Sequence, residues 1–383
     1  MVETSAARNR VNTAPTWVVT ESWFFPLAAA YGAMSLPLFI FGWLGYLPLP
    51  PGLLTPAGHA HELLFGFALA VVTGFLVNRV SPTRLGLLLT LWVLARLTFL
   101  FDPGSGLTAV TNIGFAGLVA MTAAPRFMKA AKKWRNRLIG PMVLAICAAA
   151  AIFQLFSAGD GGYRLYIVMS EAVVLFALLM LFFGGRLIAP AAAGAIERGG
   201  GVLTARVQPR VEGAILLAMI AAALTAPIPA LHPTHGLLLI LAGLLALVRL
   251  GRWQLWRCAH RPDLLCLGLG YAWLGAGLLL LGTARGFDVG LTPGIATHAI
   301  TVGALGTLTT SIMLRNRLLR LRVPLERAGP GFVAMTLLIT TAALARLVGG
   351  PLHGLMLAAA AWSLALLLLL AQLLWFRHPG QPG

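Results

Sequence analysis

Apolar residues dominate the chain in long segments, and short connections rich in Gly, Pro, Lys and Arg separate these segments. A helix that crosses the hydrocarbon core of a bilayer needs about 17–25 mostly apolar residues. Because helices satisfy their own backbone hydrogen bonds within lipid, the pattern predicts an all-α fold, a polytopic membrane bundle of about twelve transmembrane helices. The expected segments are 24–44, 60–80, 84–101, 107–124, 138–157, 163–184, 212–228, 235–250, 263–283, 293–314, 331–349 and 354–376.

Lys and Arg gather in every second connection along the chain. Of the 28 basic residues, 24 follow the even-numbered segments or lie in the two tails. Cytoplasmic loops are enriched in Lys and Arg, so both termini are predicted to be cytoplasmic. This topology gives a cytoplasmic tail at 1–22, a single transmembrane domain at 23–377 and a second cytoplasmic tail at 378–383.

Composition excludes a water-soluble domain, because 59% of the 383 residues are hydrophobic and only 10% are charged. The net charge of +17 is spread over short loops. It therefore indicates topology and contact with the lipid bilayer, and it predicts no nucleic-acid partner. The sequence has no Cys-x-x-Cys-His segment, so a covalently attached c-type haem is not expected.

Six of the eight histidines fall at the predicted outer face, in segments that carry few other charges. They are His59, His61, His232, His235, His298 and His353. Each one taken singly fits an ordinary interfacial histidine. As a set they favour a metal or haem site at the outer end of the bundle, because neutral imidazole is the commonest metal ligand in proteins.

A weak internal repeat relates the second and third predicted helices to the tenth and eleventh. A shift of 237 residues places TPAGHAHELLFG, at 55–66, on TPGIATHAITVG, at 292–303, and it aligns His61 with His298. The helices that follow share the tetrapeptide Leu-Ala-Arg-Leu, which contains Arg96 in one copy and Arg346 in the other. Both copies therefore place a histidine and an arginine near the outer end of a helix pair.

The spacing of His59 and His61 along one helix predicts that their side chains point in different directions. Successive residues of a helix turn by about 100°, so His59 and His61 point to different sides. We interpret His61 and His298 as the axial or metal-ligating pair, with Glu62 as the acceptor that fixes a ring tautomer. The remaining outer histidines could hold a second metal, and an i, i+3 pair suits copper or zinc. They are His59, His232, His235 and His353.

Charged residues within membrane helices are costly and usually have a partner. Arg96 and Arg346 therefore need anions near the outer face, and haem propionates would serve because guanidinium binds carboxylates bidentately. The alternatives are an ordinary ion pair with an acid or snorkelling to the interface. Glu171, about eight residues into the sixth predicted helix, fits either a protonated structural group or part of a proton path.

Several stretches carry a family resemblance. GHAHELLFGFALAVVTGFL at 58–76 is similar to the signature of the NnrS family, and THAITVGALGTLTTSIMLR at 297–315 resembles a second family segment. The resemblance implies a bacterial inner-membrane protein that contains haem and copper and is linked to nitric oxide stress. It places His59, His61, Glu62 and His298 on motif positions, together with Gly66, Gly303 and Gly306.

The chain departs from the family pattern at two places. Gly58 stands where an aromatic residue is usual, and RNRLLRLRVP at 315–324 replaces a segment of the Gly-His-Thr-Gly-Arg type. The second difference bears most on the expectation of copper, because it removes a histidine of the family pattern.

Three functions fit these observations. The first is an inner-membrane protein with haem b, with or without copper, that binds nitric oxide or handles redox chemistry with a redox partner at a periplasmic site. The second is a secondary transporter without haem, since twelve helices with internal repeats also suit that class. The third is a b-type cytochrome subunit that transfers electrons.

Overall fold

The computed structural model describes residues 17–130, 137–157, 159 and 162–376, and within these ranges the chain is almost entirely helical. This confirms the predicted all-α polytopic bundle. The helices are α1 (Glu21–Trp43), α2 (Pro56–His61), α3 (Leu69–Val77), α4 (Pro82–Phe101), α5 (Gly106–Ala130), α7 (Ile139–Ser157), α8 (Gly162–Arg198), α9 (Pro209–Thr225), α10 (His232–Gly251), α11 (Pro262–Gly286), α12 (Pro293–His298), α13 (Leu305–Leu321), α14 (Gly329–Val348) and α15 (His353–Trp375).

The other elements are short. Two π-helical stretches join α2 to α3 and α12 to α13, so each of these pairs forms one continuous helix. The strands β1 (Val18–Val19) and β2 (Arg79–Val80) pair antiparallel, with Val18 opposite Val80. The π-helical stretches are Glu62–Ala68 and Ala299–Ala304, and four 3₁₀ turns lie at Pro51–Leu53, Pro229–Leu231, Leu255–Cys258 and Leu325–Ala328.

The described ranges contain twelve long helices, and each covers one of the twelve predicted apolar segments. Eleven of these helices are long and apolar enough to cross a membrane. The twelfth, α9, has only 17 residues and carries Arg210 and Glu212 in its first turn. The largest difference lies in α8, which continues to Arg198, well beyond the predicted end at 184, because an alanine-rich stretch sustains the helix after Pro190. The predicted C-terminal tail, 378–383, lies outside the described residues, as does most of the N-terminal tail.

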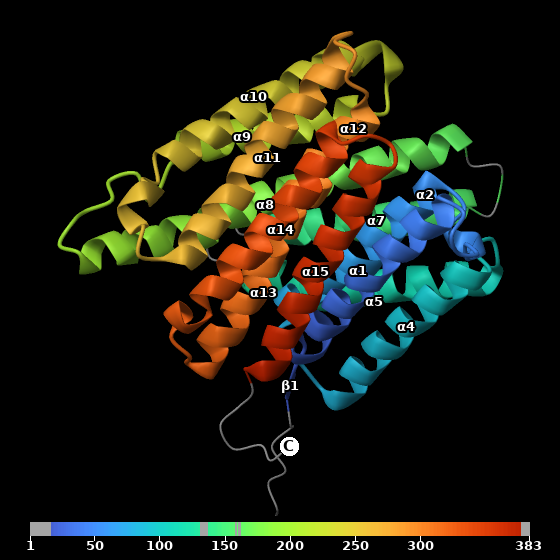
Figure 1. Cartoon of the computed structure of the whole chain (residues 1–383), viewed down its shortest axis with the longest axis horizontal. Coiled ribbons are helices and arrows are strands. Elements are labelled where there is room, and N and C mark those ends of the chain that lie inside the picture. The colour runs from blue at the N-terminus through green and yellow to red at the C-terminus, as the bar shows by residue number, and fades with distance from the viewer. Residues whose placement is uncertain (1–16, 131–136, 158, 160–161, 377–383) are drawn as a thin grey trace, which may run out of the picture.

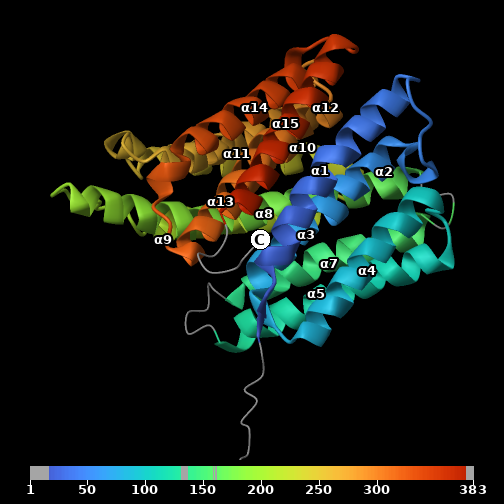
Figure 2. The same cartoon turned by 60° about the horizontal axis from the view of Figure 1, so that its bottom comes forward.

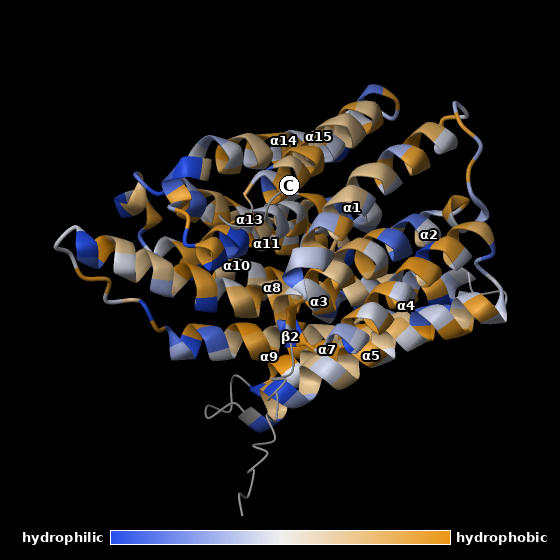
Figure 3. Ribbon diagram, turned by 90° about the horizontal axis from the view of Figure 1, so that it is seen from below, coloured by the Kyte–Doolittle hydropathy of each residue, from blue (hydrophilic) through white to orange (hydrophobic). Residues whose placement is uncertain are grey.

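Two groups of helices flank α8. In Figures 1 and 2, α4, α5 and α7 lie together on one flank, and α9, α10 and α11 lie together on another. Helix α8 packs against α7 on the first side and against α9 and α11 on the second. Figure 3 shows that hydrophobic residues, in orange, predominate along the helices. This distribution suits a bundle whose outer surface contacts lipid.

The N-terminal and C-terminal helices close against each other. Helix α1 packs on α15, where Trp362 Nε1 donates to the carbonyl of Gly32 at 2.9 Å and Ser363 Oγ donates to the carbonyl of Ala33 at 2.8 Å. At the end of the bundle where α1 begins and α13 ends, Glu21 pairs with Arg320. Arg320 also donates to Asn78 Oδ1 at 3.3 Å, and Arg126 donates to the carbonyl of Arg79 at 2.7 Å, so the basic ends of α3, α5 and α13 meet at this end of the bundle.

The internal repeat extends to the backbone. In both copies a threonine caps the helix, since Thr55 and Thr292 accept hydrogen bonds from backbone N–H groups three residues ahead. A proline follows each cap, a six-residue α-helical segment ends at His61 or His298, and a π-helical stretch begins at the next residue. Such π-helical insertions are rare and frequently occur at functional sites.

Close packing of α10 on α11 depends on glycine. A Cβ atom at Gly243 would lie 2.7 Å from the carbonyl oxygen of Gly275, which belongs to the backbone of α11. We expect Gly243→Ala to destabilise the protein by about 1–3 kcal/mol, because the two helices must move apart. The measurement is thermal unfolding in detergent, followed by a thiol-reactive dye at the buried cysteines Cys147, Cys258 and Cys266.

Gly251→Ala is the matched control in the same helix, since a Cβ atom there would meet nothing within 4 Å. An equal loss of stability in both variants would contradict the packing argument.

Candidate functional site

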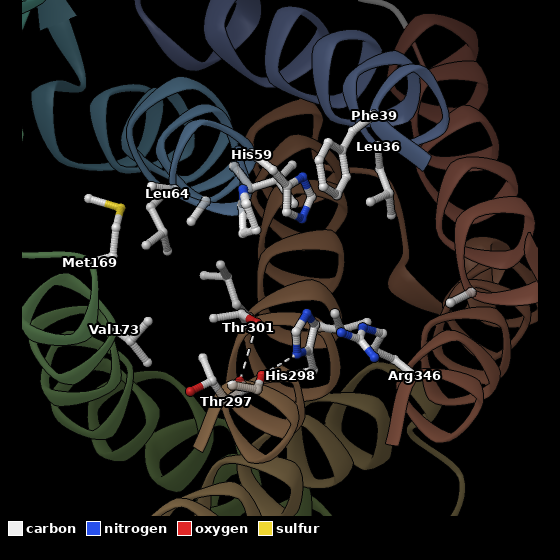
Figure 4. Close-up of a pocket in the computed structure, with 18 of the residues that line it drawn as sticks. Leu36, Phe39, His59, Leu64, Met169, Val173, Thr297, His298, Thr301 and Arg346 are labelled. Carbon is white, nitrogen blue, oxygen red and sulfur yellow. Dashed lines mark hydrogen bonds between the residues drawn. The ribbon is translucent and has the colours of Figure 1, made fainter. Parts of the chain in front are cut away.

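A cavity of about 550 Å³ opens at the end of the bundle where α2, α8, α12 and α15 begin and where α1, α11 and α14 end. We call it the histidine cavity, because His59 and His298 both line it. Most of its wall is apolar, with Leu36, Phe39 and Leu64 among the lining residues (Figure 4). Its volume falls within the range typical of small-molecule and cofactor sites.

His59 enters the cavity from α2. Its ring stacks on Phe39 of α1, with the ring centroids 4.2 Å apart and the planes 10° from parallel. This contact fixes the plane of the imidazole. Figure 4 shows His59 on the α2 wall and His298 on the α12 wall, on facing sides of the same space. Two histidines from the two repeat copies therefore share one cavity.

His298 is held in one tautomer by its own helix. Its Nδ1 lies 2.7 Å from the carbonyl oxygen of Gly294, and a carbonyl can only accept, so Nδ1 carries the proton. The lone pair of the neutral ring is then on Nε2. A histidine whose one nitrogen donates to a backbone carbonyl is typical of metal ligands, because this bond fixes the ring for coordination through the other nitrogen.

Two arginines bring positive charge to the histidine cavity. Arg346 of α14 lies beside His298 in Figure 4 and interacts electrostatically with both cavity histidines. Among the described residues, the Arg346 guanidinium has no carboxylate within salt-bridge distance. Arg285 of α11 also lines the cavity and donates to Ser170 Oγ at 2.6 Å. The cavity therefore offers a site for an anionic group.

His61 lies in a separate buried network, away from the cavity lining. Its Nδ1 is 2.8 Å from Glu62 Oε1, and its Nε2 is 2.7 Å from Gln154 Nε2. The ring stacks on Phe99, with the centroids 3.9 Å apart, and packs against the tilted ring of Phe153 at 4.5 Å. Both ring nitrogens are therefore engaged, and the structure does not bring the predicted pair, His61 and His298, together in the cavity.

Glu62 is the centre of this network. It pairs with Arg96 and accepts a hydrogen bond from the Tyr31 hydroxyl, and Arg96 Nη2 donates to Asn112 Oδ1 at 2.5 Å. Arg96 thus follows the ion-pair alternative, in which an acid of the neighbouring helix serves as its partner. The repeat explains why Arg346 differs, since the residue equivalent to Glu62 is Ala299.

The family model described as NnrS protein matches residues 22–379. The chain belongs to the NnrS family. Membership supports a role related to nitric oxide stress, and the family is known for binding haem and metal. A search of curated proteins found no match.

The glycines at NnrS motif positions let large side chains pack closely against the two repeat helices. A Cβ atom at Gly66 would lie 2.8 Å from Arg96 Nη1, so this glycine lets Arg96 reach Glu62 across the helix surface. Gly303 contacts Trp273, and Gly306 contacts Trp362, in the second copy. The motif thus supports packing around both histidine-bearing helices.

The other histidines predicted as metal ligands in this NnrS protein lie apart from the histidine cavity. His235 is buried in α10, where its Nδ1 donates to the carbonyl of Ala222 at 2.9 Å, and His232 begins the same helix. His353 is exposed at the start of α15. Within the part of the chain that the structure describes, no three His, Cys, Asp or Glu side chains come together as a metal site.

Glu171 follows Ser170 in α8, next to the lining of the histidine cavity. Glu171 interacts electrostatically with Arg285, and its Oε1 is buried without a hydrogen-bond partner among the described residues. Sequence reasoning did not select Arg285 or Ser170 as site residues. Arg285 ends a helix at the predicted outer face, as Arg346 does, but the internal repeat does not contain it. Its position on the chain was the one available signal.

Proposed function

We propose that this NnrS protein binds one haem b in the histidine cavity, between His59 and His298, and that the haem binds nitric oxide. The observation that carries the proposal is the pair of imidazoles on facing walls of one cavity. His59 takes the place that sequence reasoning gave to His61, because both nitrogens of His61 are engaged elsewhere.

The residues present fit a haem in three respects. The cavity volume of about 550 Å³ is in the range of cofactor sites. The apolar wall suits a porphyrin face, and the Nδ1 proton of His298 leaves Nε2 available as a ligand. Arg346 and Arg285 supply the charges that carboxylate propionates need.

Haem bound here supplies an iron that coordinates diatomic gases such as nitric oxide. The protein residues would hold and shield it: His59 and His298 would ligate it until nitric oxide takes the place of one imidazole, Arg346 would orient its propionates, and the apolar side chains would exclude water. The concentration of Lys and Arg in the connections at the opposite end of the bundle supports a periplasmic position for this cavity in a bacterial inner membrane, where a redox partner could reach it. Copper belongs to the proposal only as a second metal, since the described residues provide no three-ligand cluster for it.

Optical spectroscopy of the detergent-purified protein tests the proposal. We expect a Soret band in the oxidised protein, α and β bands after reduction with dithionite, and a shift of the Soret band when nitric oxide is added. A folded protein without haem absorption after expression with added haem precursor would overturn it.

Arg346→Ala should weaken haem retention, because the propionates lose a charge-assisted hydrogen bond worth about 1.5–3 kcal/mol. The measurement is the rate at which apomyoglobin extracts haem from the purified protein, which we expect to rise about tenfold or more. Arg346→Lys should recover part of the retention, since it keeps the charge but loses the bidentate geometry.

Arg84→Ala, an exposed arginine at the start of α4, is the control for this charge change. Equal extraction rates for wild type and Arg346→Ala would contradict the assignment of Arg346 to the propionates.

A secondary transporter is the second candidate function. The observation that favours it is the internal repeat, in which both copies contain a π-helical stretch at equivalent positions, because many transporters are built from internal repeats. The same spectrum separates the two candidates, because a transporter of this kind would be colourless. A b-type cytochrome would show the haem bands but would not require a shift with nitric oxide.

A further inference from the structure

A second cavity, of about 70 Å³, lies deeper in the bundle. We call it the apolar cavity, because its lining comes from aliphatic and aromatic side chains of four helices with a single hydroxyl among them. Val72 and Phe75 contribute from α3, Phe176 and Met180 from α8, and Leu308 from α13. No function described above uses it.

The apolar cavity continues the histidine cavity along one seam between the α2–α3, α8 and α12–α13 helices. Residues of the α2–α3 helix line the histidine cavity up to Phe67, and they line the apolar cavity from Ala68 onward. On α8 the change comes between Val173 and Phe176. Leu305, at the start of α13, lines both cavities, so one side chain borders the two spaces.

The chemistry of the apolar cavity excludes polar ligands. Its single hydroxyl, that of Thr309, donates to the carbonyl of Leu305 at 2.7 Å within its own helix. A buried water needs two to four polar partners, and apolar cavities stay dry and take up xenon or small hydrocarbons. A space of about 70 Å³ holds only a few molecules of the size of water.

We propose that the apolar cavity is a docking site for small apolar gas molecules and that the seam past Leu305 delivers them to the histidine cavity. Nitric oxide is such a molecule, and it partitions into the bilayer that surrounds the bundle. Delivery of nitric oxide along the seam rests on the proposed function, whereas the affinity of the apolar cavity for an apolar gas does not. The docking site would hold gas inside the membrane, beside the proposed haem.

Xenon tests the docking site independently of haem. We expect crystals of the full chain under xenon pressure to show a xenon atom in the apolar cavity, and we expect Val72→Phe to remove it by filling the space. Leu344→Phe, at an exposed site on α14, is the control that should leave xenon bound. An apolar cavity without xenon, or one that contains a lipid chain, would overturn the proposal.

Stopped-flow association of nitric oxide with the purified, haem-loaded protein tests delivery. Leu305→Ala should widen the border between the cavities and raise the association rate several-fold, whereas Leu305→Phe should lower it. Opposite changes cannot arise from a general loss of folding. Equal rates in wild type and both variants would overturn the delivery route, while absence of any haem spectrum would instead overturn the proposed function and leave the xenon result valid.

Discussion

Replacing His298 by alanine should remove nearly all haem from the purified protein, and replacing His59 by alanine should have the same direction of effect. Both imidazoles line the histidine cavity, and the neutral tautomer of His298 leaves Nε2 free to bind a metal. The measurement is the ratio of Soret absorbance to protein absorbance at 280 nm, in samples that give a single symmetrical peak in size-exclusion chromatography.

His61→Gln is the control that separates the two histidines of the GHAHE segment. A glutamine amide can still donate to Glu62 and accept from Gln154, so the buried network keeps its partners. We expect this variant to retain its haem. Loss of the Soret band in His61→Gln, with retention in His59→Ala, would instead favour the ligand pair that the repeat predicts.

The fold could be predicted from the sequence because lipid leaves the backbone few choices. A segment that crosses hydrocarbon must be helical, so apolar length alone located the twelve helices to within a few residues at most ends. The end of α8 could not be predicted in this way, because Ala191–Ala193 and the residues up to Arg198 can be helical either inside or outside lipid. The high helix propensity of alanine set the end of α8, and hydropathy does not measure helix propensity.

The site could be predicted only in part. The repeat correctly indicated two equivalent helix starts with histidines, and helix geometry indicated that His59 and His61 point to different sides. Which of them faces a cavity depends on neighbouring helices, since Phe99 and Phe153 enclose His61 while Phe39 supports His59 beside open space. These contacts join residues far apart in sequence, so spacing along one helix could not reveal them.

The same comparison explains why the two repeated arginines differ. Arg96 and Arg346 share a tetrapeptide and a position near the outer end of a membrane helix, which suggested the same kind of anionic partner for both. The difference lies one residue after each histidine, where Glu62 in one copy gives Arg96 its partner and Ala299 in the other leaves Arg346 to the cavity. One copy of the repeat thus holds a buried ion pair, and in the other copy the arginine has no carboxylate partner among the described residues.

Replacing Glu62 by leucine should destabilise the protein by about 3–5 kcal/mol, because it leaves the Arg96 guanidinium buried without a counter-charge. The expected loss is the second large effect after haem removal. Its measurement is the free energy of unfolding from titration with sodium dodecyl sulfate in mixed micelles. The Glu62→Leu/Arg96→Met double variant should recover part of the loss, since it buries no unpaired charge.

Glu326→Leu is the matched control at the surface. Its carboxylate is 60% exposed and lies 3.7 Å from Arg261, so its removal should cost less than about 1 kcal/mol. If Glu62→Leu cost no more than Glu326→Leu, or if Arg96→Met were as destabilising with leucine at position 62 as with glutamate, the pair would not be coupled. In that case Arg96 would be free to bind a propionate, as the repeat first indicated.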